Sequence, residues 1–207
     1  MNFVIAIDGP AAAGKGTIAR QLAEKFDFAH LDTGILYRAV ASKSLDEGIE
    51  PEIAASDLTH ADLTRLNLRD PLISKEASRV AVIPEVRSCL QRFQIEFSQK
   101  SGGVILDGRD IGTVICPDAD IKFYICATTL VRARRRYEEL IERGVKTTLK
   151  EVQDELTRRD EMDSKRHHSP LHKADDAILI DTSLLSIEQA CNITVNFVKN
   201  ALTKKID

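Results

Sequence analysis

The sequence shows few of the features that mark secreted, membrane-bound or metal-binding proteins. Its 207 residues contain only four cysteines, which are widely spaced with no CxxC pair: Cys89, Cys116, Cys126 and Cys191. This spacing argues against a disulfide framework or a zinc site and predicts reduced thiols. No apolar run approaches the roughly 20 residues of a membrane span, and no signal peptide precedes the first predicted strand. We therefore expect a cytoplasmic protein without membrane contact.

Neither sign of charge dominates the chain. With 29 Lys and Arg against 32 Asp and Glu, the net charge is −3, which argues against a general attraction to nucleic acid. The five histidines lack the spacing of a metal site, and the sequence contains no convincing Ser-His-Asp set and no nucleophile elbow. Basic residues do cluster in the second half, at 132–136 and 158–166. These clusters favour a local site for an anion.

What the sequence does contain is a phosphate-binding loop. An apolar run at 3–7 predicts a buried strand before it, and residues 18–26 have the spacing of a helix after it. In this setting backbone N–H groups and a helix N-terminus bind phosphate, and the lysine reaches the outer phosphates of a nucleotide. The loop consists of Gly9, Pro10, Ala11, Ala12, Ala13, Gly14, Lys15, Gly16 and Thr17.

The hydroxyl of this loop is displaced by one residue. A Ser or Thr normally follows the lysine and contacts magnesium, but here Gly16 follows it and Thr17 comes next. This order predicts a looser or water-mediated metal contact at Thr17. Asp107 ends a second apolar strand, where its carboxylate could hold the magnesium or its waters opposite Lys15. The alternative is that Asp107 is a turn residue before Gly108.

Short apolar segments alternate with helical patterns along the chain. The segments that predict strands are 3–7, 29–32, 104–106, 121–125 and 177–181. This order predicts an α/β fold with a five-stranded parallel sheet flanked by helices on both faces. Ligands bind at the carboxyl ends of such strands, which here carry Asp8, Asp32, Asp107 and Asp181.

Residues 48–83 are less regular and predict a modest insertion. Short helices are expected near 52–55 and 61–66, while Pro71 and Pro84 punctuate the pattern. We expect the next helix to begin at Pro84. Before the insertion, Thr33 is a candidate N-cap for a helix that continues to about Glu47.

Two sets of charges on predicted helices allow two interpretations each. Arg159, Asp163 and Arg166 share a stripe and could grip a phosphate, but their spacing alone slightly favours a solvated ion-pair ladder worth about 0.5 kcal/mol. Arg132 and Arg136 share another face. They either close over a transferring phosphate or belong to a solvated helix.

Arg109 and Asp110 follow Asp107 directly, and this pair suits either substrate contact or a surface salt bridge. The lack of a nucleophile fits phosphoryl transfer, in which a protein supplies positioning and charge rather than covalent chemistry. A phosphate acceptor is already anionic, so it needs cations rather than a general base. The arginines of the second half therefore favour a small-molecule kinase for a charged acceptor.

Four blocks of the sequence resemble known kinases. The loop with its G-K-G-T ending resembles the nucleoside monophosphate kinases, and residues 32–38 (DTGILYR) resemble the D-[ST]-G-x-x-Y-R block of bacterial cytidylate kinases. Residues 107–114 (DGRDIGTV) resemble the D-G-R-D-x-G-T-V block of that family. Residues 159–166 (RDEMDSKR), followed by 169–171 (SPL), resemble its R-D-x-x-D-x-x-R block. The blocks occur in the family's order and cover nearly the whole chain.

The resemblance implies a P-loop kinase that transfers the γ-phosphate of ATP to CMP or dCMP with magnesium. It implies a monomer, and the charge and hydropathy described above argue against nucleic-acid and membrane partners. It also implies a short NMP-binding insertion and a short mobile lid on the kinase core. We expect these parts at the following residues: the core at about 1–47, 84–128 and 167–207, the insertion at about 48–83 and the lid at about 129–166.

The resemblance also implies roles for individual residues. The loop 9–17 becomes the ATP site, with Thr17 and Asp107 at the metal, directly or through water. In the family, the residues matching Ser78 and Arg87 read the cytosine edge, and the aspartate matching Asp163 holds the sugar. The acceptor set is Thr33, Arg38, Ser78, Arg87, Arg109, Asp110, Arg159, Asp163 and Arg166. The catalytic cations are Lys15, Arg132, Arg136 and Arg159.

The insertion departs from the family pattern, because it is short and has no hairpin signal between Leu66 and Ser74, where relatives often carry extra strands. Two other functions compete with a cytidylate kinase. One is a kinase for another small acceptor such as UMP, dTMP or shikimate. The other is a nucleotide-dependent switch, which would need a water-positioning residue and segments that order on the γ-phosphate. The sequence has no motif for a switch.

Overall fold

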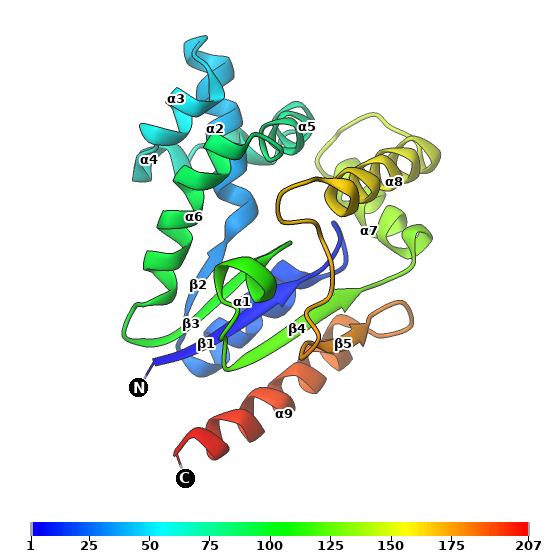
Figure 1. The fold of residues 1–207 in the computed structure, drawn as a ribbon. Coiled ribbons are helices and arrows are strands. Elements are labelled where there is room, and N and C mark those ends of the chain that lie inside the picture. Colours follow the sequence, from blue (N-terminus) through cyan, green and yellow to red (C-terminus); the bar gives the residue numbers. More distant parts are fainter. Residues whose placement is uncertain (1, 207) are drawn as a thin grey trace.

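The computed structural model describes residues 2–206, which fold around a five-stranded parallel sheet (Figure 1). The strands are β1 (Asn2–Asp8), β2 (Ala29–Asp32), β3 (Gly102–Gly108), β4 (Ile121–Cys126) and β5 (Ile178–Asp181). They lie in the order β2-β3-β1-β4-β5, and each neighbouring pair is parallel. The predicted α/β fold and its five strands are confirmed. All the carboxyl ends therefore lie along one edge of the sheet.

Helices cover both faces of the sheet (Figure 1). Alternation along β1 explains the two cores, because Phe3, Ile5 and Ile7 point to one face and Ala6 points to the other. The first face is covered by α1 (Lys15–Phe26) and α9 (Ile187–Ile206), and the second by α2 (Thr33–Glu47) and α6 (Pro84–Ser98). No helix within residues 2–206 has the length and apolar character needed to cross a membrane.

Two further helices, α7 (Thr129–Glu142) and α8 (Leu149–Lys165), pack against each other around a small core of their own. Thr148 begins α8 with a capping box, in which its hydroxyl accepts from the Glu151 N–H and the Glu151 carboxylate accepts from the Thr148 N–H. The buried members of this core are Ala11 of the loop with Ala133, Leu140, Val152 and Leu156. The helix pair therefore packs directly on the phosphate-binding loop.

Residues 48–83 contain only helices and connecting turns. They form α3 (Pro51–Ser56), α4 (His60–Leu63), a 3-10 turn η1 (Leu66–Arg69) and α5 (Pro71–Val80). The sequence pattern did not predict α5. Pro71 does not interrupt this segment but occupies the first turn of the helix, where the N–H that proline lacks would have no helical partner. Ile73, Ala77 and Val80 then bury one face of α5.

Two turns at the carboxyl edge of the sheet differ from expectation. The prediction of Thr33 as an N-cap is wrong, because α2 begins at Thr33 with Asp32 in the capping position. The Thr33 hydroxyl donates instead to the carbonyl oxygen of Asp107 (2.8 Å), so it is already occupied. Residues Ile111–Ile115 form one turn of π-helix, η2, which no sequence signal predicted.

Candidate active site

The loop between β1 and α1 is shaped by its glycines. Gly9 and Gly14 have φ angles of 144° and 100°, which few other residues adopt. A Cβ atom on Gly9 would also collide with the carbonyl oxygen of Ile125 in β4. The neighbouring strand therefore requires glycine at the start of the loop.

Gly9→Ala is expected to displace the loop and lower ATP affinity about tenfold or more, since backbone strain of about 1–3 kcal/mol adds to the collision with Ile125. Isothermal titration with ATP would measure the change. Gly48→Ala is the matched control, because Gly48 also has a positive φ (64°) but open space around its Cβ position. It should lower stability modestly and leave ATP affinity unchanged. Unchanged ATP affinity in Gly9→Ala would contradict the role of β4.

Side chains from three elements hold the carbonyl oxygens of the loop. Carbonyls bonded in this way leave the backbone N–H groups of the loop as the groups that an anion can reach. The carbonyls of Pro10, Ala11 and Ala13 accept from Lys15 Nζ (2.7 Å), Arg132 Nη1 (3.2 Å) and Thr182 Oγ1 (3.0 Å), respectively.

A cavity of about 370 Å³ opens beside the loop, at the carboxyl edge of the sheet. Its lining contains seven basic side chains against the four acidic side chains of Asp32, Asp107, Glu139 and Glu155. This excess of positive charge favours an anionic occupant. The basic residues are Lys15, Arg20, Arg38, Arg69, Arg109, Arg136 and Arg159.

Two of these cations are desolvated and lie near other positive charges. Burial lowers the pKa of Lys15 to about 7, with Arg109 adding to the effect and Asp107 opposing it. Burial and Arg109 likewise lower the pKa of Arg159 to about 10. The Arg159 Nε atom is buried without a hydrogen-bond partner among the described residues. Desolvated cations of this kind are costly without an anion, so the cavity is suited to bind one.

Asp107 lies on the same cavity, and His30 holds it. His30 Nε2 lies 2.7 Å from Asp107 Oδ1, while Oδ2 is turned toward Gly16, 3.9 Å from the position of a Cβ there. The sequence assigned no partner to His30. The parallel pairing of β2 with β3 brings the two residues together. One carboxylate oxygen of Asp107 is thereby fixed, and the other faces the loop.

Asp8, at the end of β1, is a functional residue that the sequence marked only as a strand end. Its two carboxylate oxygens accept from the N–H groups of Ile111 (2.8 Å) and Gly112 (2.7 Å). Burial raises the pKa of Asp8 to about 6, although these two bonds act in the opposite direction. Asp8 thereby fastens η2 to β1 and fixes the turn that carries Arg109 and Asp110.

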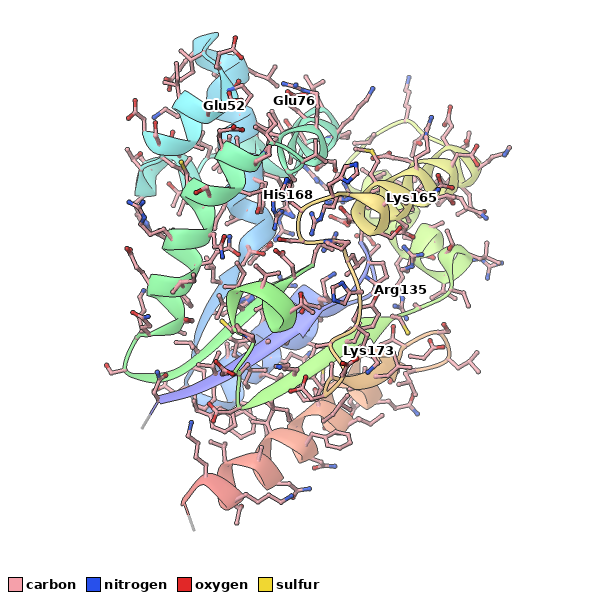
Figure 2. All side chains as sticks on the ribbon, in the orientation of Figure 1. Glu52, Glu76, Arg135, Lys165, His168 and Lys173 are labelled. Atoms are coloured by element: carbon pink, nitrogen blue, oxygen red, sulfur yellow. The ribbon has the colours of Figure 1, made fainter. Side chains whose placement is uncertain are left out.

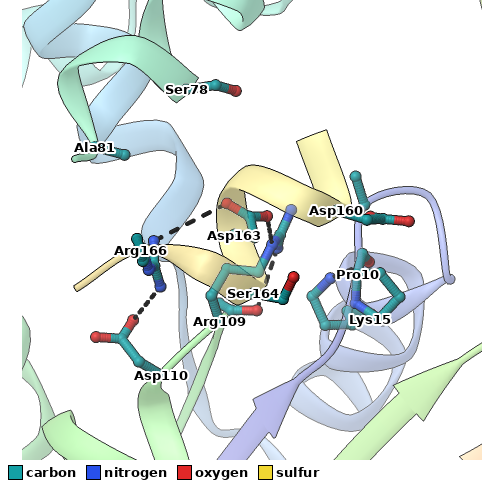
Figure 3. Close-up of polar contacts among 12 residues, drawn as sticks. Pro10, Lys15, Ser78, Ala81, Arg109, Asp110, Asp160, Asp163, Ser164 and Arg166 are labelled. Atoms are coloured by element: carbon teal, nitrogen blue, oxygen red, sulfur yellow. Dashed lines mark hydrogen bonds and ion pairs between the residues drawn. The ribbon is translucent and has the colours of Figure 1, made fainter. Parts of the chain in front are cut away.

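Next to the cavity, a chain of charged side chains joins α6, the turn after β3 and the end of α8. Figure 3 shows the part formed by Arg109, Asp110, Asp163 and Arg166. Arg109 Nε donates to Asp163 Oδ2 at 2.7 Å. Arg166 lies 4.0 Å from Asp163 and 3.7 Å from Asp110, and Asp110 also pairs with Arg87. Burial acts to raise the pKa of Asp163. The surrounding arginines, above all Arg109, outweigh this effect and hold the pKa below its ordinary value. Each carboxylate is thus shared by two arginines.

The burial and pairing of these charged residues exclude two alternatives that the sequence left open, the solvated ion-pair ladder and the surface salt bridge. The predicted stripe does not lie on one helix, because α8 ends at Lys165 and Arg166 follows in extended conformation. The side chains of Asp163 and Arg166 are only 13% and 6% exposed, so these residues do not form a solvated ion-pair ladder. Asp110 is buried and pairs with Arg87 rather than with Arg109. The surface salt bridge between Arg109 and Asp110 is therefore wrong as well.

Ser78 and Arg87 come from α5 and α6 and lie near this network. The Ser78 hydroxyl donates to the carbonyl oxygen of Ser74 in its own helix (3.2 Å). Arg87 is buried, and its guanidinium lies 5.8 Å from the centre of the Tyr37 ring. Figure 3 shows Ser78 on α5, across from Arg166.

The two arginines expected at the start of the lid occupy different environments. Arg132 is buried beneath the loop, where it donates to the Ala11 carbonyl and pairs with Asp160 at 2.7 Å. It does not line the cavity. Arg136, one turn further along α7, does line it and pairs with Glu139 at 2.8 Å. Only Arg136 of these two therefore faces the space that an anion would fill.

A second cavity, of about 380 Å³, adjoins the loop on the side of α9. The sequence did not predict it, although Thr182 follows the last strand directly and so belongs to the ligand-binding edge. Arg135 of α7, labelled in Figure 2, donates to Thr182 Oγ1 (3.0 Å) and to its carbonyl oxygen (2.7 Å). The lining residues with apolar side chains include Ala12, Ala13, Ile18, Leu185, Ile187 and Ala190.

The glycine loop at the edge of a parallel sheet, with a cationic cavity on one side and a more apolar cavity on the other, defines the chain as a P-loop kinase. Solved structures agree on the fold. An uncharacterized protein from Eubacterium ventriosum matches 95% of this chain and 98% of its own with a TM-score of 0.60 at 14% identity. A gluconokinase from Sinorhizobium meliloti matches 98% and 97% with a TM-score of 0.52 at 11% identity.

Sequence comparison shows the family. The family model for cytidylate kinase matches residues 5–64 and 55–200. A cytidylate kinase from Cereibacter sphaeroides is 50% identical over 199 residues, which cover 96% of both chains. One from Rhizobium meliloti is 45% identical over 212 residues, which cover the whole of both. The chain belongs to the cytidylate kinase family.

Proposed function

We propose that this protein transfers the γ-phosphate of ATP to CMP or dCMP. The observation that carries the proposal is the meeting of two anion sites in one cavity. Lys15 and the loop lie on this cavity together with Arg109 and Arg159, which lead to the network around Asp163. A donor polyphosphate and an acceptor phosphate could therefore meet at Lys15. Relatives named cytidylate kinase at up to 50% identity support CMP as the acceptor.

In this proposal ATP lies along residues 9–17, with its phosphates on the loop N–H groups and the N-terminus of α1. The second cavity is suited to the adenine ring, because it adjoins the loop and offers apolar side chains such as Ile18, Leu185 and Ile187 beside the charged side chains of α7. Arg136 lines both cavities, which supports a contact with the γ-phosphate. Arg132 is assigned a positioning role, since its guanidinium is bonded to Ala11 and Asp160.

The acceptor lies between the cavity and the charge network. Arg38 and Arg159, which line the cavity, are proposed to hold its phosphate. By family resemblance, Ser78 and Arg87 read the cytosine edge and Asp163 holds the sugar. The network residues Arg109, Asp110 and Arg166 complete the set. Thr33 packs beneath this set, because its hydroxyl is already bonded to Asp107.

Magnesium is the metal that this family uses with ATP, and the residues at the loop fit it. The Asp107 Oδ2 atom and the Thr17 hydroxyl are hard oxygen ligands near the cavity, and magnesium prefers one or two such ligands completed by phosphates and waters. We propose that Asp107 and Thr17 hold it, directly or through water. When bound, magnesium would neutralise charge that develops between the β- and γ-phosphates.

The chemistry that the protein supplies is positioning and charge. The transferring phosphoryl group spreads negative charge over its oxygens, and in this proposal Lys15, Arg136 and Arg159, which line the cavity, stabilise that charge. An oxygen of the CMP phosphate attacks the γ-phosphorus while the bridging oxygen to the β-phosphate leaves with ADP. The acceptor is already anionic, so no side chain has to remove a proton.

The division into parts follows the same proposal. Residues 48–83 are proposed to bind the monophosphate and 129–166 to act as the lid, each resting on the core formed by the rest of the chain. The resemblance to the family favours a monomer as the active form.

At pH 8, ATP binding is expected to take up close to one proton. In the protein without ATP the pKa of Lys15 is about 7, so most molecules carry a neutral Lys15 amine at pH 8. The negative charge of bound phosphates would raise this pKa, and the amine would take up a proton. Isothermal titration in two buffers with different ionisation enthalpies would measure the uptake. It should fall to near zero below pH 6, where Lys15 is already protonated, and should be absent in Lys15→Ala. Uptake that persists in Lys15→Ala would assign the proton to another group.

The function is tested with purified protein, ATP, magnesium and each nucleoside monophosphate, by measuring ADP release. We expect strong turnover with CMP or dCMP. Equal ADP release with and without acceptor would favour hydrolysis and a nucleotide-dependent switch. Turnover with UMP or dTMP but not CMP would replace the proposed acceptor.

A further inference from the structure

We propose that Arg69, in the insertion, binds the phosphate of the acceptor nucleotide and is held in place by Arg143 from the end of α7. This inference rests on the proposed kinase function. No sequence block marked either residue. Arg69 is the last residue of η1, and Arg143 caps the C-terminus of α7.

The charge of Arg69 lacks a counter-charge within the protein. Three other arginines on the cavity have one, since Arg38 lies 3.6 Å from Asp32, Arg109 pairs with Asp163, and Arg136 pairs with Glu139. Across residues 2–206, no carboxylate lies within ion-pair distance of Arg69, and the same holds for Arg20 and Arg159. Its guanidinium is thus available to a ligand.

Arg69 also lies close to a residue already proposed at the acceptor phosphate. Both Arg69 and Arg38 line the cavity. Burial lowers the pKa of Arg38, and the positive charge of Arg69 lowers it further, against the opposing effect of Asp32. Two guanidiniums held near one another repel unless an anion lies between them. A phosphate with two negative charges matches this pair and the fork geometry of arginine.

Arg143 fixes the position from which Arg69 acts. Its Nη1 atom donates to the carbonyl oxygen of Arg69 (2.7 Å), and its Nη2 atom donates to Asp70 Oδ1 (3.2 Å). Asp70 is the N-cap of α5, so these bonds clamp the joint between η1 and α5. The clamp joins the end of α7 to the insertion. Figure 1 shows α5 of the insertion beside the α7–α8 pair. The placement of Arg69 therefore depends on contact between the two segments.

The first test replaces Arg69 with alanine and, to preserve more of the side chain, with glutamine. In both variants KM for CMP should rise about tenfold or more, since a lost hydrogen bond to a charged group has effects of that size, while KM for ATP stays within twofold. The control is Arg79→Ala on the outer side of α5. Arg79 is 60% exposed and pairs with Glu76, which Figure 2 labels. An unchanged KM for CMP, or a rise in KM for ATP instead, would overturn the inference.

The second test addresses the clamp. Arg143→Ala should raise KM for CMP several-fold, and Arg69→Ala/Arg143→Ala should be no worse than Arg69→Ala alone, because Arg143 acts through Arg69. If the increases in KM for CMP of the two single variants multiply in the double variant, Arg143 does not act through Arg69.

An error in the choice of CMP as the acceptor would be detected separately, from the acceptor preference of the wild-type protein. The inference concerns the phosphate group, which all nucleoside monophosphates share. A wild-type preference for UMP would therefore replace CMP as the acceptor, and the same variants would then be compared with UMP. Arg69 variants that bind UMP as the wild type does would still overturn the role of Arg69.

Discussion

Lys15→Ala is expected to lower kcat by about 100-fold or more. The Lys15 ammonium lies at the cavity, where it donates to the Pro10 carbonyl at 2.7 Å, within a loop that holds it in place before any ligand binds. Removing one such preorganised charge from a desolvated site typically costs this much in rate. Steady-state turnover with ATP and CMP at saturating concentrations would measure the loss.

Two controls separate charge from structure. Lys15→Met keeps most of the side-chain volume and should lose as much activity as Lys15→Ala. Lys25→Ala removes an exposed lysine from the other end of α1 and should behave as the wild type. The melting temperature of Lys15→Ala should be unchanged or higher, because the variant no longer buries a charged amine. Wild-type turnover in Lys15→Met would show that charge at this position is dispensable.

Asp163→Asn is expected to raise KM for CMP roughly 30-fold or more and to change KM for ATP little. The Asp163 carboxylate accepts from Arg109 and lies 4.0 Å from Arg166, so the neutral amide leaves two partly buried guanidiniums without their shared counter-charge. Truncating one member of a buried charge pair has effects of about 2–5 kcal/mol. Initial rates at varied CMP concentration would give the change in KM.

The matched control is Asp154→Asn, which makes the same substitution on the same helix. Asp154 is 54% exposed, and its one ion-pair partner within residues 2–206 is Lys150, so its loss should be nearly silent. Lys165, labelled at the end of α8 in Figure 2, pairs with Glu161 in the same exposed manner. If Asp163→Asn and Asp154→Asn behave alike, the network around Asp163 does not serve the acceptor.

The architecture was predictable because its signals are local. Each strand is a short apolar run, and the start of α8 follows from the capping box formed by Thr148 and Glu151. The helix α5 was not predictable in the same way. A proline can either begin a helix or interrupt one. At Pro71 the outcome depends on the packing of Ile73, Ala77 and Val80, which the local sequence does not show. The π-turn η2 depends on Asp8, which is distant in sequence.

The candidate site was predictable as a set of residues but not as a set of partners. Sequence blocks pointed to Asp107 and Asp163. They could not show that His30 holds one and Arg109 the other, because these contacts join residues 77 and 54 positions apart. Spacing on a single helix suggested Arg166 as a partner of Asp163 but gave no sign of Arg109, its hydrogen-bond donor. Arg69 belongs to no block, and only the folding of η1 brings it to the cavity.

The small core shared by α7 and α8 has a consequence for local unfolding. Its buried members come from these two helices and from Ala11, whereas the two larger cores enclose the sheet. A unit with so little buried apolar surface opens at a lower free energy than the sheet. Amide protons of α7 and α8 should therefore exchange with deuterium sooner than those of β1 and β3. Because Ala11 seals this core, nucleotide in the loop should slow that exchange.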